Sequence, residues 1–126
     1  MIILIQIILT LSFSSAEENS VTQLKKAQSK LRTEIKKLIA TPSCKQNSDC
    51  GVVEMGNSGG CGNPDTFWAH SLKKETAKKL KTLVQMERQV AYKIVQKTQS
   101  KDGDMIMGAC GYKSPQVKCV NQLCHL

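Results

Sequence analysis

Six cysteines in a chain of 126 residues are the feature that most limits what this chain can fold into. A chain this short forms one small domain with a modest core, so cross-links would contribute much to its stability. The six are Cys44, Cys50, Cys61, Cys110, Cys119 and Cys124. An even number favours three disulfides in an oxidising compartment, with the connectivity left open. A large multi-domain enzyme is excluded.

Metal binding and thiol catalysis are the alternatives to disulfides. The chain has no C-x-x-C pair, and His70 and His125 do not complete a short-spaced zinc ligand set. Asp102-Gly103-Asp104 lacks the further acidic ligands of a calcium loop. A catalytic cysteine beside His70 would leave five thiols, which cannot all pair within the chain. We therefore expect no metal and no cofactor.

The first residues indicate the compartment. Ile2 to Leu11 is an apolar run of about ten residues, shorter than the ~20 that span a bilayer. Ser14 and Ala16 provide the small side chains of a signal-peptidase site, although the usual charged region before the apolar run is missing. We expect a signal peptide over residues 1–16 and a periplasmic or secreted product. No other apolar run is long enough to span a membrane after cleavage.

Hydrophobic periodicity predicts two helices. The first begins at Asn19 or Ser20 and ends near Ala40, because Pro42 disfavours helical geometry before it. Its apolar or neutral positions step by three and four residues: Val21, Leu24, Gln28, Leu31, Ile35 and Leu38. The second runs from about Leu72 to Lys101, with a broad apolar face of Ala77, Leu80, Leu83, Val84, Ala91, Ile94 and Val95. We expect the two to pack within one chain; self-association is the alternative.

The remaining elements are short strands. Residues 49–54 and 66–70 predict two antiparallel strands joined by a glycine-rich loop, with Phe67 and Trp68 on opposite faces. Residues 117–126 predict a hairpin about Asn121-Gln122, with an apolar face of Val117, Cys119, Cys124 and Leu126. The fold class is therefore α+β: two helices, one of them long, packed with a small antiparallel sheet and stapled by disulfides. A basic amphipathic helix occupies residues 17–43, and a cysteine-rich α+β domain occupies residues 44–126.

The order of these features resembles a known family. The features are C-x5-C with Asp49 before its second cysteine, a glycine-rich loop, Cys61-Gly62-Asn63-Pro64, an aromatic strand ending in Ser71, a long helix, Cys110, and Pro115-x3-Cys119-x4-Cys124. This pattern resembles a family of small, uncharacterised bacterial secreted proteins and lipoproteins. The chain differs by lacking a lipoprotein cysteine and by its basic N-terminal helix. The resemblance implies fold and compartment, and it implies no activity.

Charge is the clearest surface signal, with 18 Lys and Arg against 10 Asp and Glu. Most of the excess lies on the two helices, and we assign their charged residues, Arg32 and Glu87 included, to the surface. Lys74, Lys78 and Lys81 follow helical spacing and form the candidate site for an anionic envelope component or an acidic protein. The alternative is a solvated face that keeps the protein soluble. Nucleic acid is not expected, because no aromatic residues interleave with the basic ones.

These features favour a binding module without catalytic chemistry. The alternative is a secreted inhibitor, of the protease or lysozyme type, that inserts the loop between Cys50 and Cys61 into an enzyme cleft. A hydrolase using His70 with Ser71 or Asp65 is disfavoured, because no nucleophile motif such as G-x-S-x-G is present. The sequence indicates neither the oligomeric state nor the partner.

Overall fold

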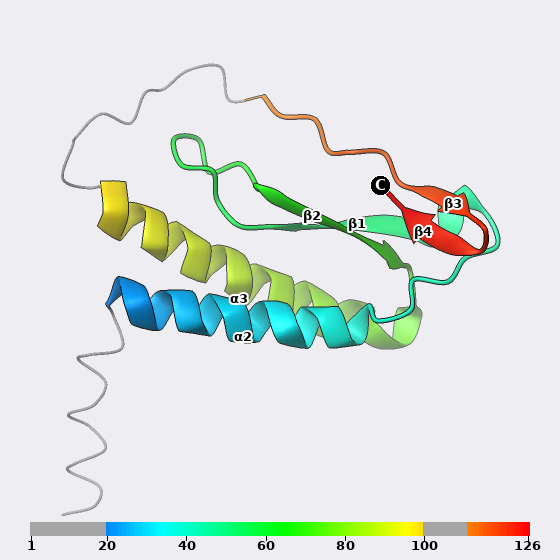
Figure 1. Cartoon of the computed structure of the whole chain (residues 1–126), viewed down its shortest axis with the longest axis horizontal. Coiled ribbons are helices and arrows are strands. Elements are labelled where there is room, and N and C mark those ends of the chain that lie inside the picture. Colours follow the sequence, from blue (N-terminus) through cyan, green and yellow to red (C-terminus); the bar gives the residue numbers. More distant parts are fainter. Residues whose placement is uncertain (1–19, 100–110) are drawn as a thin grey trace, which may run out of the picture.

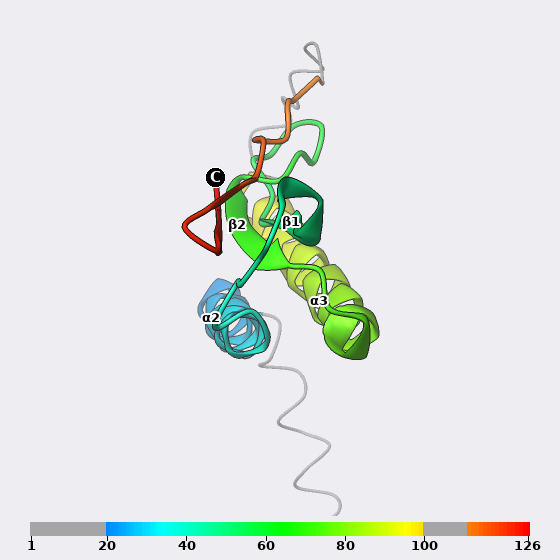
Figure 2. The same cartoon turned by 90° about the vertical axis from the view of Figure 1, so that its right-hand side faces the viewer.

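The structure is a computed structural model that describes residues 20–99 and 111–126. Its elements are α2 (Val21–Leu38), β1 (Cys50–Met55), β2 (Thr66–Ser71), α3 (Lys74–Gln99), β3 (Lys118–Val120) and β4 (Leu123–His125), with a 3₁₀ turn at Asn47–Asp49 (Figure 1). The two helices run in opposite directions on one side of the β1–β2 hairpin, and the β3–β4 hairpin lies beside β2 (Figure 2). The predicted α+β, disulfide-stapled fold is confirmed.

The helix α2 begins where the sequence predicts. The Ser20 hydroxyl accepts a hydrogen bond from the backbone N–H of Gln23, which satisfies a donor that the first turn leaves unpaired. The helix ends at Leu38, two residues before the predicted end, and the N–H of Ile39 donates to the carbonyl of Ile35. Leu24 and Ile35 are buried, so the predicted apolar stripe faces the interior.

The main core lies between the helices and the β1–β2 hairpin. Ile35, Val53, Met55 and Leu80 are buried there, and Trp68 packs against them. The two helices therefore pack within one chain, as expected. Ala77 is exposed, although the periodicity assigns it to the apolar face of α3. No helix in residues 20–99 or 111–126 is long and apolar enough to cross a membrane.

The predicted small sheet is present as two separate two-stranded sheets. In the first, Cys50 pairs with Ser71 and Met55 pairs with Thr66. Trp68 faces the core, whereas the ring of Phe67 lies 6.4 Å from that of Tyr112, which confirms that these neighbours point opposite ways. The paired strands leave the glycine-rich loop at one end of the molecule (Figure 1).

The C-terminal hairpin has the predicted register, with Cys119 opposite Cys124. Asn121 and Gln122 adopt φ values of 51° and 65°, the left-handed geometry of a tight hairpin turn. Leu126 is 54% exposed, so its predicted place on the inner face is wrong. It lies beyond the last paired residue of β4, His125, so the sheet does not hold it against the interior.

Two disulfides join the segment around the start of β1 to the C-terminal hairpin. Cys44 bonds to Cys119 and Cys50 bonds to Cys124. Cys44, Cys50 and Cys124 are buried and form a second cluster, against which Cys119 and Ala69 pack. Cys61 is also disulfide-bonded. The remaining predicted disulfide cysteine, Cys110, lies outside the described residues, as do the predicted signal peptide over residues 1–16 and the predicted helix end at Lys101.

Asp49 stabilises the turn that leads into this cluster. Its carboxylate accepts hydrogen bonds from the backbone N–H groups of Lys45 and Gln46, at 2.9 and 3.1 Å. These bonds hold the pKa of Asp49 below its usual value of 3.8. The ionised form therefore stabilises the fold above the usual pKa, and this contribution is lost as the pH falls through the lowered pKa.

The two disulfides close nearly the same loop, with sequence separations of 75 and 74 residues. With either bond present, the other closes a ring of only about a dozen residues, because the cysteines on each side are near neighbours. We expect alanine substitution of one pair to cost about 3 kcal/mol and of both pairs about 7 kcal/mol, measured by denaturant unfolding without reductant. A single-pair variant as unstable as the double variant would contradict this.

Candidate functional site

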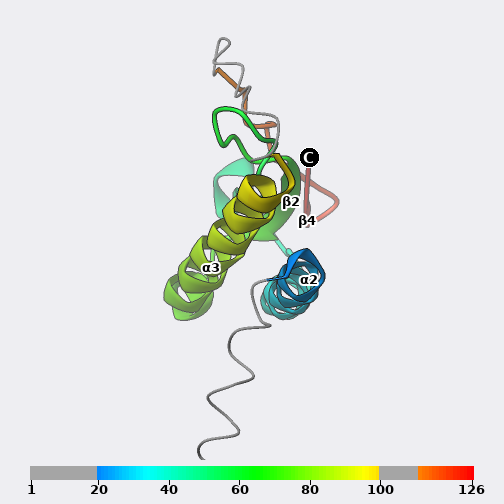
Figure 3. The same cartoon turned by 90° about the vertical axis from the view of Figure 1, so that its left-hand side faces the viewer.

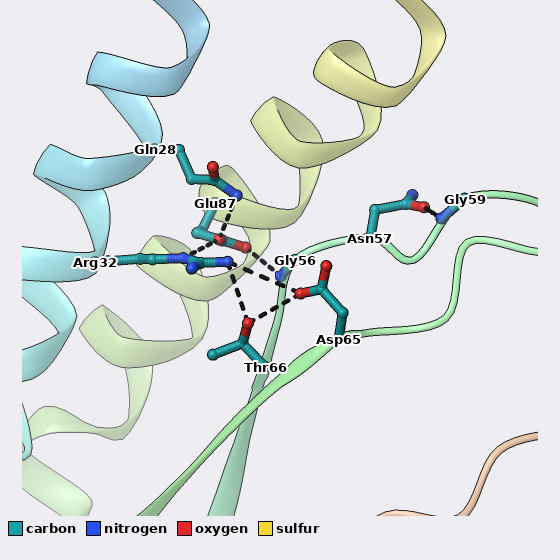
Figure 4. Close-up of polar contacts among 8 residues, drawn as sticks. All are labelled: Gln28, Arg32, Gly56, Asn57, Gly59, Asp65, Thr66 and Glu87. Carbon is teal, nitrogen blue, oxygen red and sulfur yellow. Dashed lines mark hydrogen bonds and ion pairs between the residues drawn. The ribbon is translucent and has the colours of Figure 1, made fainter. Parts of the chain in front are cut away.

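A fully buried carboxylate, Glu87 of α3, connects the two helices (Figure 4). Its Oε2 accepts hydrogen bonds from Arg32 Nε at 2.8 Å and from Gln28 Nε2 at 3.2 Å, both donors belonging to α2. The assignment of Glu87 and Arg32 to the charged surface is therefore wrong: Glu87 is 0% exposed and the Arg32 side chain 28%. A buried carboxylate is tolerated because it is paired and hydrogen-bonded.

The other oxygen of Glu87 binds the glycine-rich loop. Its Oε1 accepts the backbone N–H of Gly56 at 2.7 Å, at the point where β1 ends. Gly56 has a φ of 80°, a backbone conformation that favours glycine, and a Cβ atom there would force the Asp65 side chain to move. Arg32 Nη2 lies 4.0 Å from Asp65 Oδ1 and donates to Thr66 Oγ1 at 3.4 Å, where β2 begins. One network thus binds both ends of the loop to both helices (Figure 4).

The loop itself, residues 56–65, is fixed by further hydrogen bonds. Arg88 Nη2 donates to the carbonyl of Gly62 at 2.8 Å, and the N–H of Gly59 donates to Asn57 Oδ1 at 2.8 Å. The N–H of Ser58 donates to the carbonyl of Asn63, on the other side of the loop, at 2.8 Å. The loop therefore has a defined shape anchored on α3, and no disulfide joins Cys50 to Cys61, since Cys50 bonds to Cys124.

The spacing of polar residues along the two helices indicates this network, although the charge pattern does not. Glu87 lies between Val84 and Ala91 at three- and four-residue spacing, which is a core position of α3. Gln28 occupies a core position of α2 in the same way. Two polar residues at core positions of the two helices indicate a hydrogen bond between them, and the structure contains one, which is partly buried.

The predicted anion-binding lysines lie on the surface of α3. Lys74, Lys78 and Lys81 are all exposed. None of the three makes an ion pair within residues 20–99 and 111–126. By contrast, Lys37 on α2 lies 3.7 Å from the carboxylate of Glu34. The three lysines thus present charge that the described residues do not neutralise.

The residues considered for hydrolysis are not brought together. His70 Nδ1 lies 3.2 Å from the carbonyl oxygen of Ser71, and burial lowers the pKa of His70 below 6.5. The Ser71 hydroxyl donates to the carbonyl of Ser43 at 2.7 Å. Asp65 precedes β2, whereas His70 and Ser71 end it, so the strand separates the carboxylate from the imidazole. No nucleophile, base and orienting group meet among these residues.

The cysteine sulfurs gather closely enough to suggest a metal cluster, but disulfide bonds occupy them. The Sγ atoms of Cys44, Cys50 and Cys124 lie within 4.8 Å of one another. Each is part of a disulfide, whereas a metal binds the free thiolate. The acidic residues Asp102 and Asp104 of the calcium-loop fragment lie outside the described residues.

Comparison of the chain with protein-family models, with curated proteins and with solved structures finds no match. The resemblance to small bacterial secreted proteins stays a prediction.

The buried pair gives a stability prediction with an internal control. Arg32→Ala leaves the Glu87 carboxylate buried without its charged partner, so we expect a loss of about 3–5 kcal/mol in unfolding free energy. Lys37→Ala breaks an exposed ion pair on the same helix and should cost less than about 1 kcal/mol. Urea unfolding of both variants measures the difference. Equal losses would mean that the buried network adds nothing beyond a surface pair.

Proposed function

We propose that the protein is a periplasmic or secreted binding module that attaches to an anionic envelope surface through α3. The observation that carries this proposal is the unneutralised charge of Lys74, Lys78 and Lys81 on one exposed stretch of the helix. Disulfides support a location in an oxidising compartment. An export signal over residues 1–16 belongs to the same proposal.

The lysines suit a broad, negatively charged surface better than a single small anion. They follow one another at four and three residues, so they lie along one side of a straight element. Leu80, between them in sequence, is buried and anchors that helix to the core. The net charge of +8 adds a long-range attraction to lipid phosphates or lipopolysaccharide.

Charge reversal tests this surface. Converting Lys74, Lys78 and Lys81 to Glu should abolish co-sedimentation with phosphatidylglycerol or lipopolysaccharide vesicles. Wild-type binding should weaken steeply between about 20 and 150 mM salt, because screening shortens the reach of exposed charges to ~8 Å. The matched control variant converts Lys25, Lys26 and Lys30 of α2 to Glu. These lysines are exposed as well, and this variant should retain binding. Circular dichroism checks that both variants fold.

Three results would contradict the proposal. Equal sedimentation of all three proteins would assign the lysines to a solvated surface that aids solubility. Equal loss in both reversed variants would mean that net charge, and no particular face, drives binding. Capture of an acidic protein by the wild type, without vesicle binding, would replace the lipid surface with a protein partner.

A second candidate function, a secreted inhibitor, is favoured by the fixed shape of the 56–65 loop. Hydrogen bonds from Arg88 and to Glu87 hold the loop before any partner arrives. A preorganised loop loses less conformational entropy when it enters an enzyme cleft. Ser58 is exposed on this loop and is available for contact.

The inhibitor candidate predicts loss of inhibition when the loop surface changes. Incubation with a panel of proteases and lysozymes should identify an enzyme that the wild type inhibits. Ser58→Arg should then abolish inhibition, because the larger side chain blocks insertion of the loop. Ser29→Arg, an equal change at an exposed position of α2, should leave inhibition intact. The candidate is wrong if no enzyme of either class is inhibited, or if both variants inhibit equally.

A further inference from the structure

A groove of about 670 Å³ lies between the 56–65 loop and the C-terminal half of α3. Asn57 and Gly62 of the loop form one wall, and α3 residues from Gln85 to Gln96 form the other. Figure 3 views this end of the molecule, with the yellow end of α3 and the green loop toward the reader. The volume falls within the ~300–1,000 Å³ of typical small-molecule sites.

The groove is rich in carboxamide groups. Asn57, Gln85, Gln89 and Gln96 all line it, and none of its lining residues within 20–99 and 111–126 carries a carboxylate. Each carboxamide carries both a donor and an acceptor, which matches a hydroxyl group, because a hydroxyl also donates and accepts. Asn57 already accepts from Gly59 through its oxygen, so that contact fixes the orientation of its side chain (Figure 4). Such a lining suits a ligand with several hydroxyl groups.

An oriented aromatic ring lies in the same groove. Tyr92 is 49% exposed, and Gln96 Nε2 donates a hydrogen bond to its hydroxyl oxygen at 2.9 Å. An exposed ring held in this way offers a flat apolar face beside polar groups. The C–H face of a pyranose ring fits against such a surface while its hydroxyls reach the carboxamides. A saccharide therefore matches both the ring and the amides.

The charges that line the groove are positive. Arg88 uses one nitrogen, Nη2, to bind the carbonyl of Gly62, which holds the guanidinium at the groove wall. Lys93 is exposed one residue beyond Tyr92. Guanidinium and ammonium groups bind carboxylates through charge-assisted hydrogen bonds. The pair thus favours an acidic ligand over a neutral one.

We propose that this groove binds an acidic saccharide through its carboxylate, its hydroxyls and one ring face. The site lies toward the C-terminal end of α3, beyond Lys74, Lys78 and Lys81, so it is independent of the proposed envelope-binding surface. A single-stranded nucleic acid would also meet positive charge here. Its binding typically uses several aromatic rings, one for each stacked base, whereas the described part of this lining holds a single ring, that of Tyr92.

Titration with trigalacturonate, followed by calorimetry and by amide chemical shifts, tests the site. We expect saturable binding, with shifts at Asn57, Gln89 and Tyr92. The methyl ester of the same trisaccharide removes the charge at nearly constant size and should bind at least about tenfold more weakly, a change of ~1.4 kcal/mol. Tyr92→Ala should weaken binding by a similar factor. Because Tyr92 is exposed, this substitution should leave the protein folded, which circular dichroism checks.

A charge-matched pair of variants separates this groove from general electrostatic attraction. Lys93→Gln and Lys78→Gln each remove one exposed charge from α3. The first should weaken trigalacturonate binding about fivefold and the second less than about twofold. The proposal would be overturned by equal effects of the two variants or by the absence of saturable binding. Amide chemical-shift changes confined to the Lys74 end of the helix would also overturn it. Tighter binding of a short oligothymidylate than of trigalacturonate would overturn it in favour of nucleic acid.

Discussion

The arrangement of the other elements depends on the hydrogen bonds that the buried carboxylate of Glu87 accepts. Its two oxygens accept three hydrogen bonds, from Gln28 and Arg32 of one helix and from the backbone at Gly56. Removing such a group from water is unfavourable unless all these donors are in place. The helices and the hairpin must therefore meet in one arrangement. Apolar contacts alone tolerate several arrangements, because they have no directional requirement.

Local signals in the sequence account for most of the secondary structure. Apolar spacing places both helices, Ser20 caps the first, and Asn121-Gln122 supports the tight turn of the C-terminal hairpin. The pairing of Cys119 opposite Cys124 follows from the position of that turn, since strand register is set by the hairpin connection. In each case the residues that determine the element lie within it or a few positions away. The local sequence is therefore sufficient to predict it.

The candidate surfaces depend on contacts between distant residues, and the sequence left these open. The disulfide pairing joins residues more than 70 positions apart. The burial of Glu87 requires a donor from a helix 55 residues earlier in the chain, and the same charge pattern also fits an exposed helix. Only the core spacing of the polar residues Gln28 and Glu87 distinguishes a buried Glu87 from an exposed one. The groove beside Tyr92 needed the loop and α3 to meet, which periodicity does not specify.

The paired disulfides also determine how the chain would respond to a protease. A single backbone cut between Cys50 and Cys119 produces two fragments that both bonds still join. The new ends of a cut in the 56–65 loop would stay beside Arg88 and Glu87, whose contacts lie at Gly62 and Gly56. Religation would then be an intramolecular reaction, favoured by the high effective concentration of the two ends. The fold thus carries the glycine-rich 56–65 loop inside a covalently closed ring.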